Sequence, residues 1–161
     1  FGRGIRDPEN GRVAESIWRD DMIQLRDSIV YCSKCSAQNF YDNEVMKTTG
    51  GRLNPCWRCK KEVPIPPRIK IGKNVVILNH DSQLYPHHID PDRRFDFAAP
   101  VARVTQHPNA PNTWGLCNLT GSDWVAVLSD SKMQSIEPGR NVKLAQGTRI
   151  QFGKVDGEIR L

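Results

Sequence analysis

The sequence YCSKC at residues 31–35, followed by CWRCK at residues 56–60, decides the fold of the first part of this chain. Each stretch places two residues between its cysteines, and 20 residues separate the two pairs. Two tight turns that each hold two thiolates are typical of a structural zinc site, in which four sulfurs surround the ion and leave no open position. The pattern predicts one structural Zn²⁺ bound by Cys32, Cys35, Cys56 and Cys59.

Other uses of these cysteines fit less well. A secreted disulfide scaffold does not suit five cysteines that are clustered rather than spread, and a redox pair or a chance cluster of reduced cysteines is the remaining alternative to a metal site. A rubredoxin-like iron site has the same ligands, so zinc and iron both stay open. A ribbon this small cannot bury enough apolar surface to fold alone, and the metal supplies the missing free energy. Cys117, in WGLCNL, is expected to be a buried strand residue and not a fifth ligand.

The segment before the ribbon has two parts. Residues 1–10 are glycine-rich and charged, and we expect them to be disordered. In VAESIWRDDMIQLRDSI (13–29), apolar residues recur three to five positions apart, which predicts an amphipathic helix. Its apolar stripe requires a partner, either the ribbon or a preceding domain. Because the chain begins with Phe1 and not with Met, we expect it to be a piece of a longer protein.

PIPPR (64–68) predicts an extended connector, and the pattern of apolar and polar residues changes after it. Beyond it, short apolar runs alternate with turn signals at the spacing of an antiparallel β-sandwich or barrel. RIKI and VVIL flank GKN as in a hairpin, and EPGR (137–140) and AQG (145–147) predict turns. We expect a mainly β protein with a start and helix (1–30), a zinc ribbon (31–63), a connector (64–68) and an antiparallel β-sandwich (69–161).

Signatures of catalysis are missing from the sequence. It contains no phosphate-binding glycine loop, no G-x-S-x-G elbow, no H-E-x-x-H and no kinase motif, so we expect that this chain is not an enzyme. His87 and His88 are adjacent, and on an extended segment they would point to opposite faces. A shared metal ion, or a small hydrolase built on the two, is therefore disfavoured. Asp90, Asp92 and Asp96 surround Arg93-Arg94, which predicts a self-paired loop.

Charge and hydropathy limit the partners. The sequence has no apolar run of the roughly 18 residues that a membrane span needs and no secretory signal, so we expect a cytoplasmic protein without membrane contact. The formal net charge is +5, and Trp57 lies among Arg52, Arg58, Lys60 and Lys61. A nucleic-acid-binding ribbon is the alternative function that this favours. The other interpretation is that Trp57 packs on the preceding helix and the basic residues keep the ribbon soluble.

The segment WGLCNLTGSDWVAVLSDSKMQSIEPGRNVKLAQGTRIQFG (114–153), with the terminal GEIRL, resembles the closing strands of a forkhead-associated (FHA) domain. The resemblance covers residues 68–161. It implies an FHA-like β-sandwich in which a small polar turn grips a phosphopeptide, and Asn118 and Thr120 are closest to that turn. We expect alanine at either position to weaken binding of a protein partner and to leave the fold intact.

The phosphate-binding residues of the FHA family are not all present. With Gly72-Lys73 in place of the family's Gly-Arg pair, Tyr85 lies near its serine and His88 on its histidine. With APVARV (99–104) on the serine segment, Tyr85-Pro86 replaces Gly-Arg, and we prefer this register because it leaves room for a strand before WGLCNL. Neither register restores the full set, so we expect a degenerate, scaffold-like FHA domain.

The stretch SIWRDDMIQLRDSIVYCSKCSAQNFYD (16–42) resembles the segment after the catalytic domain in bacterial eukaryotic-like Ser/Thr protein kinases, including ones associated with tellurite-resistance systems. The resemblance implies a non-catalytic C-terminal region of such a kinase. We expect a regulatory, protein-interaction module whose partner is a protein, in some cases phosphorylated, or the kinase domain in cis.

Overall fold

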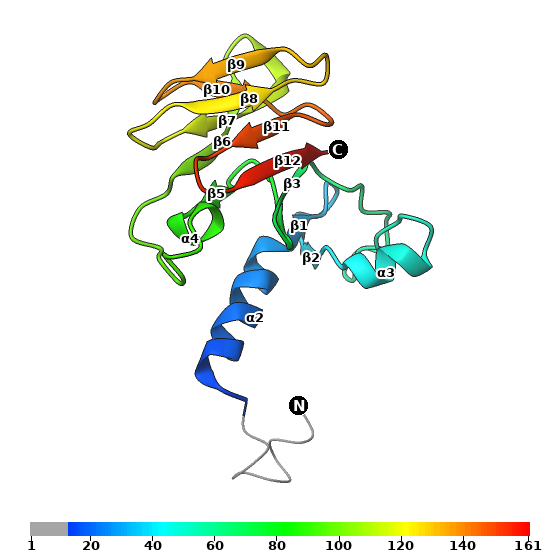
Figure 1. The fold of residues 1–161 in the computed structure, drawn as a ribbon. Coiled ribbons are helices and arrows are strands. Elements are labelled where there is room, and N and C mark those ends of the chain that lie inside the picture. Colours follow the sequence, from blue (N-terminus) through cyan, green and yellow to red (C-terminus); the bar gives the residue numbers. More distant parts are fainter. Residues whose placement is uncertain (1–12) are drawn as a thin grey trace.

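The structure is a computed structural model that describes residues 13–161, and these residues are mainly β (Figure 1). The predicted disorder of residues 1–10 lies outside the described residues. The helices are α2 (Glu15–Asp27), α3 (Asn43–Thr48) and α4 (Pro86–Ile89). The strands are β1 (Ile29–Tyr31), β2 (Gln38–Phe40), β3 (Arg68–Ile71), β4 (Asn74–Ile77), β5 (Gln83–Leu84), β6 (Ala102–His107), β7 (Ala110–Asn118), β8 (Trp124–Val127), β9 (Met133–Ile136), β10 (Asn141–Lys143), β11 (Arg149–Gln151) and β12 (Asp156–Arg160).

The second half of the chain forms two antiparallel sheets over one core. One sheet has the strand order β4-β3-β12-β11-β8-β9 and the other has the order β10-β7-β6-β5. Alternate residues of each strand point inward, so Ile69 and Ile159 of the first sheet and Leu116 and Val104 of the second belong to the same buried cluster. The predicted antiparallel sandwich is confirmed in this arrangement.

The predicted turns organise the sandwich. Gly72 has a φ of +57° between β3 and β4, which closes the hairpin that RIKI and VVIL predict. Gly139 in EPGR has a φ of +79°, and the Arg140 amide donates to the Glu137 carbonyl at 3.0 Å. A left-handed φ after proline is the geometry of a type II turn, which glycine adopts without steric cost.

The ribbon is a smaller body with its own core. Strands β1 and β2 pair antiparallel, and α3 lies in the long loop before the second cysteine pair. The buried cluster contains Val30, Leu53 and Val63 around the cysteines. The ribbon therefore begins at Ile29, two residues before the predicted boundary.

The ribbon is attached to the first hairpin of the sandwich. Ile77 of β4 is buried in the ribbon core, and Ile65 of the proline-rich connector packs against it. The Asn79 side chain donates to the Ile29 carbonyl at 2.8 Å, and the Tyr31 hydroxyl donates to the Asp81 carboxylate at 3.0 Å. The connector is thus packed on the ribbon, and the orientation of the ribbon on the sandwich is fixed by these contacts.

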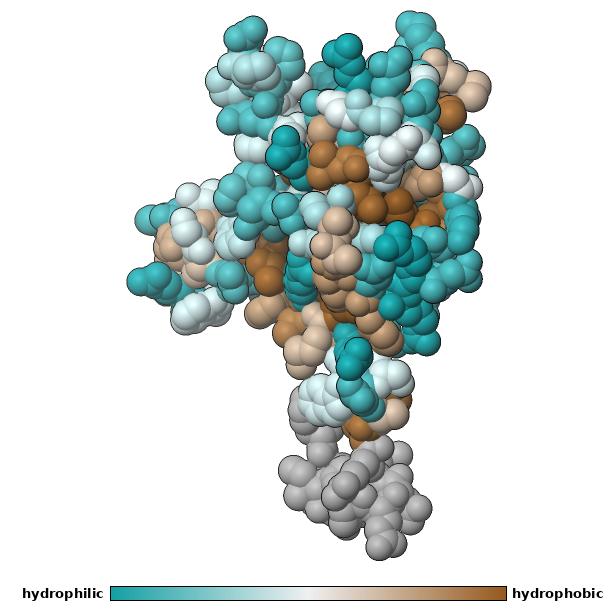
Figure 2. Space-filling view, turned by 90° about the vertical axis from the view of Figure 1, so that its left-hand side faces the viewer, coloured by the Kyte–Doolittle hydropathy of each residue, from teal (hydrophilic) through white to brown (hydrophobic). Residues whose placement is uncertain are grey.

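The N-terminal end of helix α2 extends away from both bodies, while its last residue, Asp27, contacts α4 (Figure 1). Glu15 in its first turn and Arg26 in its last suit the helix dipole. The helix ends at Asp27, before the predicted Ile29. The Ser28 amide donates the last hydrogen bond of the helix, to the Gln24 carbonyl, and Ile29 already belongs to β1. None of the 13 residues of α2 is buried. Figure 2 shows hydrophobic atoms among polar ones on the narrow part of the molecule next to the grey residues.

Candidate functional site

The four predicted metal ligands come together at one end of the ribbon. Cys32 and Cys35 lie in the turn between β1 and β2, and Cys56 and Cys59 lie in the turn after the long loop. The Sγ atoms of Cys32 and Cys59 are 3.6 Å apart, as are those of Cys35 and Cys56. Bonds of about 2.3 Å to one tetrahedral ion place sulfurs roughly 3.8 Å apart, so the cluster fits a single ion. All four Sγ atoms lie within 4.8 Å of one another.

The two cysteine turns have matching backbone geometry. The Ser36 amide donates to the Cys32 carbonyl at 2.9 Å, and the Lys60 amide donates to the Cys56 carbonyl at 2.9 Å. Ser36 and Lys60 both have positive φ, +55° and +60°. This shape brings the amides within each turn toward the sulfurs, which favours thiolates.

Those amides set the acidity of the thiols. Hydrogen bonds from the Cys59 and Arg58 amides, with Asn39 nearby, lower the pKa of Cys56 to about 6, although burial opposes the shift. Amides of Cys35 and Lys34 lower the pKa of Cys32 in the same way. At Cys35 the Ala37 amide also lowers the pKa, but burial and the neighbouring sulfurs outweigh it and raise the value to about 11. Four thiolates this close need a cation between them, which a divalent metal ion would supply.

Asn39 is a supporting residue that no pattern in the sequence indicates. Its side chain is buried in β2, donates to the Ala37 carbonyl at 2.9 Å and approaches the Sγ of Cys56 at 3.7 Å. Its carbonyl oxygen accepts from the Trp57 amide at 3.3 Å. Asn39 therefore connects the two cysteine turns, as outer residues of metal sites commonly do.

Trp57 is largely exposed instead of being covered by a neighbouring element. The indole is 64% exposed and donates its N–H to the Gln38 carbonyl at 2.8 Å. This hydrogen bond ties the exposed ring to β2. Exposed basic side chains surround it in the sequence: Arg52, Arg58, Lys60 and Lys61.

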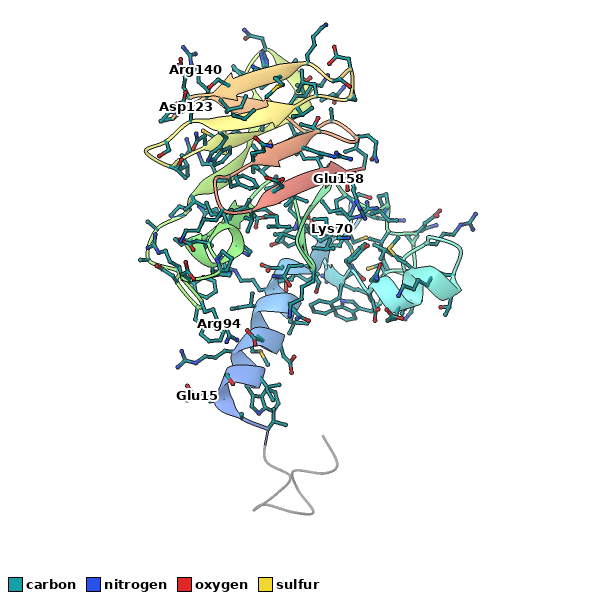
Figure 3. The ribbon with its side chains drawn as sticks, viewed as in Figure 1. Glu15, Lys70, Arg94, Asp123, Arg140 and Glu158 are labelled. Atoms are coloured by element: carbon teal, nitrogen blue, oxygen red, sulfur yellow. The ribbon has the colours of Figure 1, made fainter. Side chains whose placement is uncertain are left out.

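The turn after β7 contains the two predicted partner-binding residues. Asn118 is 0% exposed, donates to the Ser122 and Ile136 carbonyls at 2.8 and 2.9 Å, and accepts from the Thr120 amide and hydroxyl. Thr120 is half-buried, and its neighbours Gly121 and Asp123 are exposed. Figure 3 shows Asp123, at the end of this turn, and Arg140 at the end of the sandwich opposite α2. Asn118 shapes the turn from inside, and this position is at odds with our expectation that alanine there leaves the fold intact.

His87 and His88 lie side by side, not on opposite faces. They belong to the short helix α4, where consecutive side chains diverge by only about 100°, and their ring centroids are 3.9 Å apart. His88 Nε2 lies 3.1 Å from a carboxylate oxygen of Asp27, the last residue of α2. Burial lowers the pKa of His87 and outweighs the hydrogen bond to the Asp96 carbonyl, which by itself would raise the pKa.

The loop after α4 is only partly self-paired. Arg93 pairs with Asp96, as predicted. Asp90 and Asp92 instead accept from Lys154 at 2.9 and 2.8 Å, and Arg94 pairs with Asp20 of α2. The loop therefore connects α2 to the β11–β12 turn.

Comparison with protein-family models finds no matching family, and comparisons with curated proteins and with solved structures find no match. No helix within residues 13–161 combines the length and apolar character needed to cross a membrane. Cys117 is buried in β7 and lies outside the four-cysteine cluster, as expected of a core residue.

Proposed function

We propose that this chain is a non-catalytic regulatory and protein-interaction module of a bacterial Ser/Thr kinase, built from a structural zinc ribbon and a degenerate FHA-like domain. The observation that carries the proposal is the exposed apolar stripe of α2. Ile17, Met22 and Leu25 are between 46% and 52% exposed. A helix of 13 residues that buries none of them gains little from this chain's packing. In the resembled kinases this helix follows the catalytic domain, which would cover the stripe.

Zinc is the ion that we propose for the four thiols. Soft thiolates in tetrahedral arrangement select zinc or iron, and the amides around Cys32 and Cys56 favour the thiolate form. The ion would be held by four protein ligands with no position for substrate, so it would act on structure alone. It would fix the ribbon, and with it the direction in which α2 leaves the molecule.

The FHA-like part is proposed to present the rim around Thr120 to its partner. Strand β5 ends at Leu84, immediately before Tyr85-Pro86, and β6 begins at Ala102. These bounds are compatible with the register in which APVARV occupies the serine segment. Arginine, which binds phosphate through a planar pair of donors, is then missing from the Gly-Arg position. A scaffold that binds protein without a strict need for phosphate is the better match.

Two measurements test this proposal. The metal-loaded chain should bind the catalytic domain of a kinase of the resembled class, and the double substitution Ile17→Asp, Met22→Asp should remove that binding without changing the circular dichroism spectrum. Asp21→Asn, an exposed polar change on the same helix, is the matched control. Equal binding by all three proteins would refute a role for the stripe.

The rim is tested with a phosphothreonine peptide library beside the same peptides without phosphate. Selective capture that Thr120→Ala weakens, and Ser129→Ala does not, would identify a phosphorylation-dependent adaptor. Equal capture of the two peptide sets, still weakened by Thr120→Ala, would identify a phosphate-independent scaffold. Capture that is insensitive to Thr120→Ala would exclude the rim.

A second candidate function is nucleic-acid binding by the ribbon, which the exposure of Trp57 favours. An aromatic face beside basic side chains stacks bases and neutralises phosphates. Affinity for single-stranded DNA should then fall steeply with salt. It should also fall with Trp57→Ala and with loss of Arg58 and Lys60, and remain with Lys132→Ala on the sandwich.

A further inference from the structure

Three metal-ligating side chains meet where α2 touches α4. A ring nitrogen of His87, a ring nitrogen of His88 and a carboxylate oxygen of Asp27 lie within 4.8 Å of one another. Asp27 lies 60 and 61 positions before the two histidines in the sequence, and none of the three residues belongs to the cysteine cluster. We propose that this is a second metal site, which takes a divalent first-row transition ion such as Zn²⁺, Co²⁺ or Ni²⁺ with Asp27, His87 and His88 as ligands.

His87 is already prepared as a ligand. Its Nδ1 lies 3.0 Å from the Asp96 carbonyl oxygen, which can only accept, so Nδ1 bears the proton and Nε2 carries a lone pair. That Nε2 is buried and has no hydrogen-bond partner. A buried acceptor without a donor is unfavourable, and a metal ion would satisfy it. The bond from Nδ1–H to a backbone carbonyl is the outer contact that commonly orients a metal-bound imidazole.

Asp27 and His88 supply the other two positions. Their side chains are 10% and 3% exposed, and His88 Nε2–H donates to the carboxylate. The ion would displace this proton from Nε2, and Nδ1 would take it up, so His88 would bind the ion as a neutral imidazole. Two imidazoles with one carboxylate suit borderline ions of the first transition row and not Ca²⁺ or Mg²⁺.

The same contacts limit the affinity. His88 Nδ1 accepts from the Tyr85 amide at 2.8 Å. A neutral imidazole bound through Nε2 carries its proton on Nδ1, so the Tyr85 amide loses its acceptor when the ion binds. The Arg26 guanidinium, 4.7 Å from the Tyr85 ring centroid, adds a repulsive positive charge. The second ion is therefore held more weakly than the ion of the four thiolates, and a chelator removes it first.

The site also has a route to solvent and a structural consequence. Arg26 and Phe97 line an open groove between α2 and the loop after α4, together with Met22 and Phe95. Phe97, which lines this groove, also packs on His87 with ring centroids 4.4 Å apart. A bound ion would join α2 to α4 and hold the helix rigidly on the sandwich.

Cobalt reconstitution tests the proposal. Metal-free protein is titrated with Co²⁺, whose thiolate complexes absorb strongly in the near ultraviolet while nitrogen and oxygen complexes do not. We expect one equivalent with the thiolate band and a second, weaker equivalent with visible absorption alone. His87→Ala and Asp27→Asn should each remove the second equivalent and keep the first, which also shows that the ribbon still folds.

His107→Ala is the matched control because His107 is exposed and far from the cluster in the sequence, and it should bind both equivalents. A wild-type protein that takes up only the thiolate equivalent would overturn the proposal. So would a second equivalent that survives both His87→Ala and Asp27→Asn. The result is independent of whether the kinase domain binds, because it is read on the isolated chain.

Discussion

Asn118 is a buried polar residue whose side chain makes its hydrogen bonds within the protein and not with solvent. Its amide donates to the Ser122 carbonyl just before β8 and to the Ile136 carbonyl at the end of β9. Its oxygen accepts from both the amide and the hydroxyl of Thr120. The side chain therefore closes the turn and ties it to the end of β9. Any surface that the turn presents depends on this internal frame.

Replacing Asn118 with alanine should destabilise the sandwich. The substitution removes the side-chain donor to the Ile136 carbonyl in a buried place and one of two side-chain donors to the Ser122 carbonyl, at a cost of about 2 kcal/mol. Urea denaturation measures the change. Asn109→Ala, in the exposed turn between β6 and β7, is the control and should stay within about 0.5 kcal/mol of the wild type. Equal stability of the two variants would contradict the internal role.

Tyr31 provides a pH-dependent contact between the ribbon and the sandwich. Its hydrogen bond to Asp81, assisted by burial and the nearby negative charge, raises the pKa of the phenol above 10.0. The folded state thus holds this proton more tightly than the unfolded state does. The contribution is complete below pH 10 and is lost as the pH rises through the folded pKa.

Absorbance titration of the phenols should show one tyrosine that ionises late. Asp81→Asn should return its pKa toward 10.0, and Tyr31→Phe should remove the late component. Asp156→Asn, at the exposed first position of β12, is the control for general loss of negative charge. A late phenol that persists in Tyr31→Phe would assign it to another residue.

Among the strands, β12 lies in the middle of its sheet between β3 and β11. Gly157 on this strand has no room for a side chain, because a Cβ there would lie 2.8 Å from Ile69 Cδ1 and 2.9 Å from Phe152 Cε2. Gly157→Ala should therefore destabilise the protein by about 1–3 kcal/mol through overpacking. Thermal unfolding measures this. Gly121→Ala has open space and should be nearly neutral, and similar melting of both would contradict the close contact.

The elements that could be predicted are those with a strong local signal. Apolar runs such as DWVAVL and TRIQF lie between turn residues, and each became a strand of the expected sheet type. The two-residue β5 and the four-residue α4 carried too little periodicity to be seen. At α4 the signal was present but local, since Pro86 at the first helical position follows a capping Tyr85. Without that local signal, LYPHHID predicts an extended segment, which would place the two histidines on opposite faces.

At the scale of the whole molecule, the sites divide by how far apart their residues lie. The cysteine cluster could be predicted because each pair lies in one turn, and two residues between paired cysteines are typical of a metal site. The Asp27–His88 contact joins residues 61 positions apart through a helix end and a loop, and no periodicity encodes that meeting. The exposure of α2 was likewise beyond sequence, because an amphipathic pattern shows that a helix has an apolar face and not what covers it.

Removal of the metal ion that we propose for the ribbon should unfold the ribbon core and leave the sandwich core native. The ribbon cluster is built around the cysteines, whereas the sandwich has a larger cluster of its own. Cys56→Ser, which replaces a ligand with a poor one, should unfold the ribbon and leave the sandwich native. Amide hydrogen exchange, resolved by residue, should show β1 and β2 unprotected while β7, β8 and β12 remain protected.

Cys117→Ala is the matched control: it removes a buried thiol of the sandwich, should lower the stability of β7, and should leave metal content unchanged. Simultaneous loss of protection in both bodies after Cys56→Ser would show that Ile77, which belongs to the ribbon core from within β4, couples them into one cooperative unit.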